Sequence, residues 1–189
     1  MSYQQRANFR RMDECSSRDM EIFYQVRERN IAAFSTRLMS LLALLGDKFD
    51  GSPIDGYAHS LQSATLAYND GADDETVFIA LFHDIGQLVA EENHSDVSAE
   101  ILKPYISERA YWIVKHHAVF QRYYYGEAAG LDHNAREVFS DQPYYQDCIH
   151  FCESYDQCAF DSQYKNKSAE FFLPMVKRMI DSCGAQNTR

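Results

Sequence analysis

The sequence predicts a single all-α domain, and three observations support this fold class. The chain has 189 residues, which is enough for one domain with a proper core and too few for two comfortable ones. Hydrophobic residues make up 46% of the chain, including 13 Tyr and 12 Phe, which is typical of a globular protein. Apolar residues recur at helical spacing, whereas alternating strand patterns are nearly absent. We expect an N-terminal helical segment, residues 1–45, packed on a main domain of residues 46–182, with a C-terminal tail of residues 183–189.

The first elements follow from this periodicity. Apolar positions over residues 20–45 predict one long helix or two consecutive helices that end at Gly46. The segment 49–56 holds two Gly and one Pro and is expected to be a loop. The loop leads into His59, on a helix expected over residues 57–69.

The next helices have recognisable N-terminal signals. Asp73 or Asp74 can cap a helix that carries the adjacent pair His83-Asp84. Ser95 or Asp96 can cap another helix, which must stop before a proline at position 104.

The C-terminal half should contain three more helices. Ser107 can start a helix that runs through His116-His117. The polar stretch 126–142 reads as a connecting segment with at most one short helix, and two final helices are expected over residues 144–160 and 168–180.

Composition and charge exclude several classes of function. A net charge of −10 argues against a nucleic-acid backbone or an anionic membrane as partner. No apolar run approaches membrane-spanning length: Leu38–Leu45 is too short and is interrupted by Ser40, and residues 1–12 lack a secretory hydrophobic region. The five cysteines are odd in number and lack zinc-type spacing, which favours reduced thiols in a cytoplasm. We expect a cytoplasmic monomer or small homo-oligomer that acts on a small molecule.

Six residues form the candidate functional set, because imidazoles and carboxylates can bind a pair of metal ions. Imidazole suits iron, zinc and manganese, and a carboxylate can bridge two cations. On a helix, neighbouring side chains diverge by roughly 100°, so His83 could serve one ion while Asp84 bridges both. The alternative is a chance scatter of the seven histidines. The six candidate ligands are His59, His83, Asp84, His94, His117 and Asp156.

Several alternatives remain open from the residues alone. His116 competes with His117, since only one of the two can face the metals. Asp161 is the alternative closing carboxylate to Asp156. Gln62 shares a helical face with His59 and can either support a metal-bound group or simply be solvated.

Two further histidines, His133 and His150, fit no ligand spacing and are expected to be structural or exposed. Neither is included in the candidate set.

The segments His59-Ser-Leu-Gln-Ser-Ala64 and Ala80-Leu-Phe-His-Asp-Ile-Gly86, together with four His and two Asp, resemble the HD-domain superfamily. Within it, residues 49–179 look like the mixed-valent di-iron oxygenases, which include myo-inositol oxygenase and the phosphonate-cleaving HD oxygenases. The resemblance implies an HD-domain helical bundle with a di-metal site between its core helices. It also implies two iron ions in a mixed Fe(II)/Fe(III) state, with O2 as co-substrate.

The resemblance also assigns roles to the ligands. His59, His83, Asp84 and Asp156 would hold one iron, and Asp84 would bridge to a second iron held by His94 and His117. The segments 107–109 and 114–117 place the fourth histidine at His117. Asp84, Gln62 and Gln87 become the residues expected at the catalytic centre.

Two positions depart from the family pattern and bear on substrate charge. Gln87 stands where hydrolytic HD enzymes and myo-inositol oxygenase carry Lys and the phosphonate-cleaving enzymes carry His. Glu153 stands where the phosphonate enzymes carry Arg. Both changes favour a cationic or hydroxylated group over a second anion. Gln121 holds the position of a family lysine, and its neighbour Arg122 could supply the anion contact instead.

Other departures concern the pocket walls. By the resemblance, this chain lacks an inserted segment that helps to form the substrate pocket in relatives. The glutamate of the relatives' first loop matches Ser52, with Asp55 as a substitute. Tyr124, in a run of three tyrosines, could help to cage a quaternary ammonium group, although core packing is the alternative.

The resemblance therefore implies a di-iron oxygenase that cleaves a C–C or C–P bond of a small hydroxylated polar substrate, with amine-bearing and zwitterionic compounds included. Its rivals are a metal-dependent HD phosphohydrolase acting on a phosphate ester or nucleotide, and a non-catalytic HD module.

Overall fold

The computed structural model describes residues 5–49 and 51–184, and no strand occurs among them. The all-α prediction is therefore confirmed. Eight α-helices are joined by short 3-10 turns and one π-helix. In chain order the α-helices are α1 (Ser17–Ala32), α2 (Phe34–Leu44), α3 (Gly56–Asn69), α4 (Asp74–Phe82), α5 (His94–Leu102), α6 (Glu108–Ala129), α7 (Tyr145–Phe151) and α8 (Ala169–Gly184). The shorter elements are η1 (Met12–Glu14), η2 (Leu45–Asp47), η3 (Ile85–Leu88), η4 (Lys103–Tyr105), η5 (Ala135–Phe139) and the π-helix η6 (Cys152–Asp156).

Local capping explains where the site-bearing helices begin. Asp55 accepts a hydrogen bond from the Ala58 amide and starts α3. Asp73 does the same for α4, by accepting from the amide of Thr76 at 2.7 Å. Ser107 caps α6. Each cap satisfies an amide that has no partner within its own helix.

Two predicted boundaries were wrong at the centre of the chain. The helix expected to carry His83 and Asp84 ends at Phe82, so Asp84 lies in the following turn with φ −104° and ψ 3°. The next helix begins at His94 without a side-chain cap, so neither Ser95 nor Asp96 caps it.

Three boundaries differ in the C-terminal half. Helix α6 continues into the stretch predicted to be a connection and ends at Ala129, where it is capped by Gly130, whose φ of 70° favours glycine. The helix predicted over residues 144–160 is interrupted: α7 ends at Phe151 and a π-helix follows. The last helix starts one residue later than predicted and extends to Gly184.

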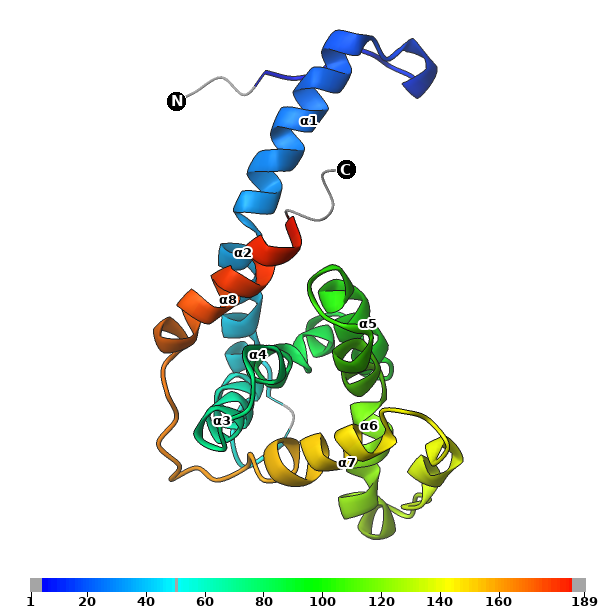
Figure 1. The fold of residues 1–189 in the computed structure, drawn as a ribbon, viewed down its shortest axis with the longest axis vertical. Helices are drawn as coiled ribbons and strands as arrows, with labels where there is room; N and C mark the ends of the chain where they lie inside the picture. Colours follow the sequence, from blue (N-terminus) through cyan, green and yellow to red (C-terminus); the bar gives the residue numbers. More distant parts are fainter. Residues whose placement is uncertain (1–4, 50, 185–189) are drawn as a thin grey trace.

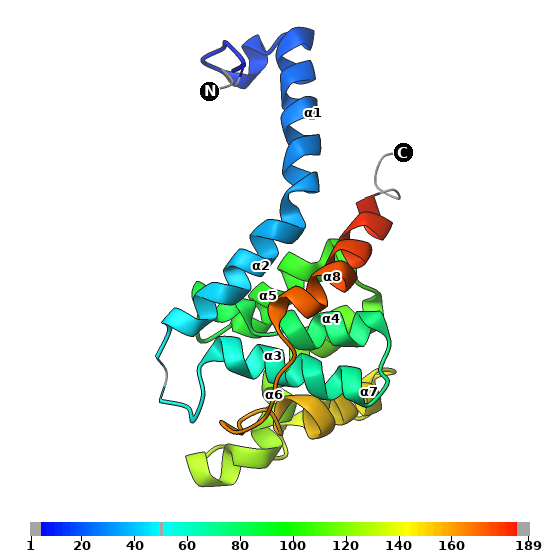
Figure 2. The same cartoon turned by 90° about the vertical axis from the view of Figure 1, so that its left-hand side faces the viewer.

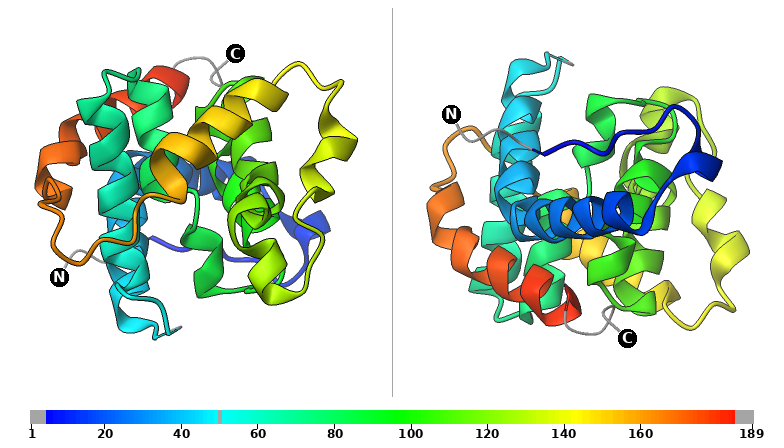
Figure 3. Two further views of the ribbon diagram at one scale, coloured as in Figure 1. Left: turned by 90° about the horizontal axis from the view of Figure 1, so that it is seen from below. Right: turned by 90° about the horizontal axis from the view of Figure 1, so that it is seen from above.

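The core lies between α3, α4, α6 and α7, where Phe78, Phe82, Phe120 and Phe151 are almost fully buried. Helices α3 and α4 pack as neighbours, as do α5 and α6. Helix α8 lies beside α2 and contacts α4 (Figures 1 and 2). Seen from below, α7 runs across the end of the bundle (Figure 3).

The N-terminal segment predicted to pack on the core divides into two parts. Helix α2 buries Leu38 and Leu42 against the bundle. Helix α1 extends away from it, with Asp19 as its single buried residue (Figures 1 and 2). Among the described helices, none combines the length and the hydropathy needed to cross a bilayer.

Candidate metal centre

Four helical elements and the turn after α4 bring the six candidate ligands to one place. His59 lies in the first turns of α3, and His83 and Asp84 follow the end of α4. His94 opens α5 and His117 lies in the middle of α6. Asp156 is the last residue of the π-helix η6, an element type that often occurs at functional sites.

All four histidines are oriented in the same way. Each Nδ1 contacts a main-chain carbonyl oxygen, which can only accept a hydrogen bond, so Nδ1 carries the proton and Nε2 presents its lone pair. Such bonds are the usual support for metal-binding imidazoles. The partners are Ala159 for His59 (3.0 Å), Ala80 for His83 (3.0 Å), Glu91 for His94 (2.8 Å) and Val114 for His117 (2.7 Å).

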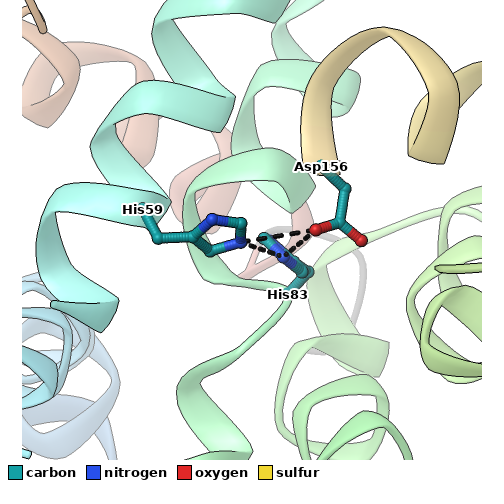
Figure 4. A group of neighbouring side chains, drawn as sticks. All are labelled: His59, His83 and Asp156. Atoms are coloured by element: carbon teal, nitrogen blue, oxygen red, sulfur yellow. Dashed lines mark hydrogen bonds and ion pairs between the residues drawn. The ribbon is translucent and has the colours of Figure 1, made fainter. Parts of the chain in front are cut away.

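His59, His83 and Asp156 form one buried trio, which we call the first group (Figure 4). The two Nε2 atoms are 3.2 Å apart and lie 3.4 and 3.6 Å from Asp156 Oδ1. Two ligands at about 2.1 Å from one metal are separated by about 3.0 Å in octahedral and 3.4 Å in tetrahedral geometry. Because two nitrogen lone pairs facing each other repel, this arrangement needs a proton or a metal cation between them.

Asp84 connects this trio to a second pair of imidazoles, those of His94 and His117. Its Oδ2 lies 3.7 Å from His59 Nε2 and 3.6 Å from His83 Nε2. Its Oδ1 lies 3.2 Å from His117 Nε2 and 3.4 Å from His94 Nε2. The two oxygens of one carboxylate thus face different pairs of imidazoles, which is the arrangement of a bridging ligand.

The carboxylates and imidazoles of the cluster shift one another's pKa. Burial alone would raise the pKa of Asp84 and Asp156, but the adjacent imidazoles, above all His83, outweigh it and hold both below their usual range. Burial alone would lower the pKa of His59 and His83, but the two carboxylates outweigh it and raise both. The pKa of His94 is lowered, mainly by burial. The carboxylates therefore remain ionised and attract cations.

The donor set fits two metal ions. Neutral imidazole Nε2 atoms and ionised carboxylates are suitable ligands for iron, zinc and manganese. Asp156 Oδ2 is buried and has no hydrogen-bond partner among the described residues, which leaves it free to bind a cation.

A pocket of about 300 Å³ opens beside the cluster. Two of the predicted contact residues, Gln87 and Gln121, line it, and Gln121 Nε2 donates a hydrogen bond to Asp156 Oδ1 at 2.8 Å. Three others do not line it: Arg122, Tyr124 and Glu153. The side chain of Glu153 is exposed on the surface of η6.

Sequence reasoning missed five residues of the pocket wall, namely Ile54, Gly56, Ala118, Tyr125 and Phe160. Tyr125 lies one turn after Gln121 and two turns after His117 on α6, so helical spacing could have identified it. No local signal identifies Phe160, because it meets His59 only in the folded chain, where the centroids of the two rings lie 4.7 Å apart.

Gln62 does not contact the metal ligands as predicted and instead bonds the main chain of Asp161. Its Nε2 donates to the carbonyl of Asp161 at 3.2 Å and its Oε1 accepts from the Asp161 amide at 3.0 Å. This buried amide therefore holds the chain that follows Asp156. Ser52 lines the pocket, whereas its proposed substitute Asp55 caps α3.

The competing ligands lie outside the cluster. His116 stacks on Trp112 with ring centroids 4.2 Å apart. Asp161 is exposed and accepts from the amide of Gln163. His133 contacts its neighbour Asn134, and His150 bonds the hydroxyl of Tyr155.

Two comparisons with known proteins show what this chain is similar to. Residues 56–142 match the HD domain family. The chain is also similar to a [1-hydroxy-2-(trimethylamino)ethyl]phosphonate dioxygenase (glycine-betaine-forming) from Leisingera caerulea, with 25% identity over 165 aligned residues. That alignment covers 71% of this chain and 84% of the relative.

Proposed function

The chain contains an HD domain, and from this premise we propose that it is a di-iron oxygenase acting on a small hydroxylated substrate. The observation that carries the proposal is the bridging position of Asp84 between two groups of imidazoles. The similarity to a dioxygenase supports the choice of oxygen chemistry. The bond cleaved would be C–C or C–P.

The proposed ligand sets leave room for reactants. The first cation would be held by the first group and Asp84, and the second by Asp84, His94 and His117. Both sets include residues that line the pocket, so a substrate hydroxyl and O2 can approach from that side. When bound, the two irons would supply the redox chemistry for which the side chains have no equivalent.

The protein's own residues perform three tasks. The carbonyl bonds to Nδ1 fix each imidazole, and Gln121 fixes Asp156 by donating to it. Phe160 covers His59 and, with Ile54, restricts water on one side of the pocket. Asp84 would help to hold both cations. The chain thereby positions the reactants and excludes solvent.

A hydrolytic role is the second candidate, because an HD domain with a two-metal centre can also activate water for attack on phosphorus. The pocket does not favour it, since no Lys or Arg of the described chain lines the wall to hold a phosphoryl group.

The test is metal analysis combined with electron paramagnetic resonance of partly oxidised protein. We expect about two iron atoms per chain and a coupled mixed-valent signal, with oxygen uptake when hydroxylated substrates are added. Protein without iron that hydrolyses phosphate esters would refute the oxygenase and support the second candidate.

A further inference from the structure

The pocket wall away from the metal ligands is electrically neutral. Its polar side-chain groups are two amides, of Gln87 and Gln121, and two hydroxyls, of Ser52 and Tyr125. Ile54 and the aromatic rings of the wall supply its apolar part. The only carboxylates that line the described pocket are the ligands Asp84 and Asp156, and neither Lys nor Arg lines it.

Lys48, a basic side chain that contacts Gln87, is already paired. Lys48 Nζ donates to the main-chain oxygen of Gln87 at 3.3 Å and forms an ion pair with Glu91 at 2.6 Å. It therefore lies behind Gln87 and does not line the pocket. Arg122 follows Gln121 on α6 and projects about 100° around the helix, outside the lining.

Among the described residues, no carboxylate other than the ligands Asp84 and Asp156 lines the pocket to compensate a cationic substrate. Glu153, predicted to attract an ammonium group, is exposed and does not line the pocket, and Tyr124 is also outside it. A charged group placed against the neutral wall would lose its hydration without gaining an ionic partner, which disfavours binding.

We propose that this pocket selects a substrate whose metal-distal end is uncharged, with Gln87 and Gln121 as the residues that set this preference. The inference rests on the proposed function, because it assumes that the metal-binding end of the substrate carries the hydroxyl group. It differs from the sequence-based expectation, which allowed a cationic end.

Three compounds with the same metal-binding head test the proposal. [1-Hydroxy-2-(trimethylamino)ethyl]phosphonate has a cationic end, and (1-hydroxy-3,3-dimethylbutyl)phosphonate is its uncharged counterpart of equal shape. (2-Carboxy-1-hydroxyethyl)phosphonate has an anionic end. Binding to the iron-loaded protein is measured by calorimetry without oxygen, so that no turnover occurs.

We expect the uncharged compound to bind most tightly and the anionic one at least tenfold more weakly, because a carboxylate loses hydration without gaining a partner. Gln87→Lys should strengthen binding of the anionic compound about tenfold, since a cation would then face its carboxylate. Gln142→Lys makes the same change in charge at an exposed glutamine outside the pocket and should leave the order unchanged. Iron content is measured for both variants.

Equal or tighter binding of either charged compound, or no binding of the uncharged one at millimolar concentration, would overturn the proposal. So would an equal gain in both lysine variants. Oxygen uptake is measured separately: if no compound supports it while the order of affinities holds, the oxygenase assignment fails and the inference about the pocket stands. If oxygen uptake occurs but the charge of the compound has no effect on its affinity, the oxygenase assignment stands and the inference about the pocket fails.

Discussion

Replacing Asp84 by Asn should remove metal from the centre while preserving the shape of the side chain. The carboxylate places one oxygen toward each pair of imidazoles, at 3.2–3.7 Å from four Nε2 atoms. The amide keeps one acceptor oxygen but presents an NH2 group, which cannot bind a cation, to the other pair. Metal content should fall from about two ions per chain to one or fewer.

The loss of metal affinity can be measured through the stabilisation that bound metal gives to the folded protein. At a free metal concentration one hundred times Kd, binding stabilises the folded protein by about 2.7 kcal/mol. For a chain of this length that raises Tm by roughly 5–11 °C. Loss of a partner that only supports a metal ligand weakens affinity by about 10–100-fold, so loss of a bridging ligand should reach at least 100-fold. At the same metal concentration the stabilisation then falls to about 0.4 kcal/mol and the shift to roughly 1 °C.

The assay is thermal unfolding with and without added Fe(II) under anaerobic conditions, together with metal analysis of the same samples. Asp161→Asn is the matched control, because it makes the same chemical change at an exposed carboxylate outside the cluster. Asp161→Asn should keep both the metal content and the full shift. Retention of two ions and a full shift by Asp84→Asn would refute the bridging assignment.

Three other predictions concern the same centre and its support. His117→Ala should lose metal whereas His116→Ala should keep it, as measured by metal analysis; equal loss would contradict the assigned helix face. Metal affinity should be lower at pH 6 than at pH 8, because His59 and His83 have a raised pKa and hold competing protons to a higher pH than ordinary histidines. A metal affinity that does not change between these pH values would exclude this competition. Gly86→Ala should destabilise the protein by about 1–3 kcal/mol or more in urea unfolding, because its Cβ would overlap the carbonyl of His94. Gly46→Ala, where the new Cβ meets only ordinary contacts, should cost much less, and similar losses in both variants would contradict the packing argument.

Local signals predicted much of the helical framework. Ser107 was identified as a cap, and Asp73 as one of two candidates beside Asp74, because a capping side chain bonds an amide only a few residues away and the sequence contains both partners. The start of α5 could not be predicted in this way. His94 begins that helix without a side-chain cap, and Gly86 packs closely against its carbonyl from an earlier segment.

The substrate side of the site was harder to predict than its metal side. Gln87 and Gln121 were identified and do line the pocket, but Glu153 and Tyr124 do not. The π-helix alters the register of side chains just before Asp156, so the simple helical spacing that placed Glu153 on the ligand face does not apply there.

The sequence by itself determined the helical class and the identities of the six candidate ligands, because hydrophobic periodicity and residue chemistry are properties of the chain. Only the tertiary structure decided which oxygen of Asp84 faces which imidazoles, and which amides line the pocket. It also showed that Gln62 bonds the main chain of Asp161, far along the sequence. These features depend on how distant helices rotate and pack against each other, and no short-range pattern contains that information.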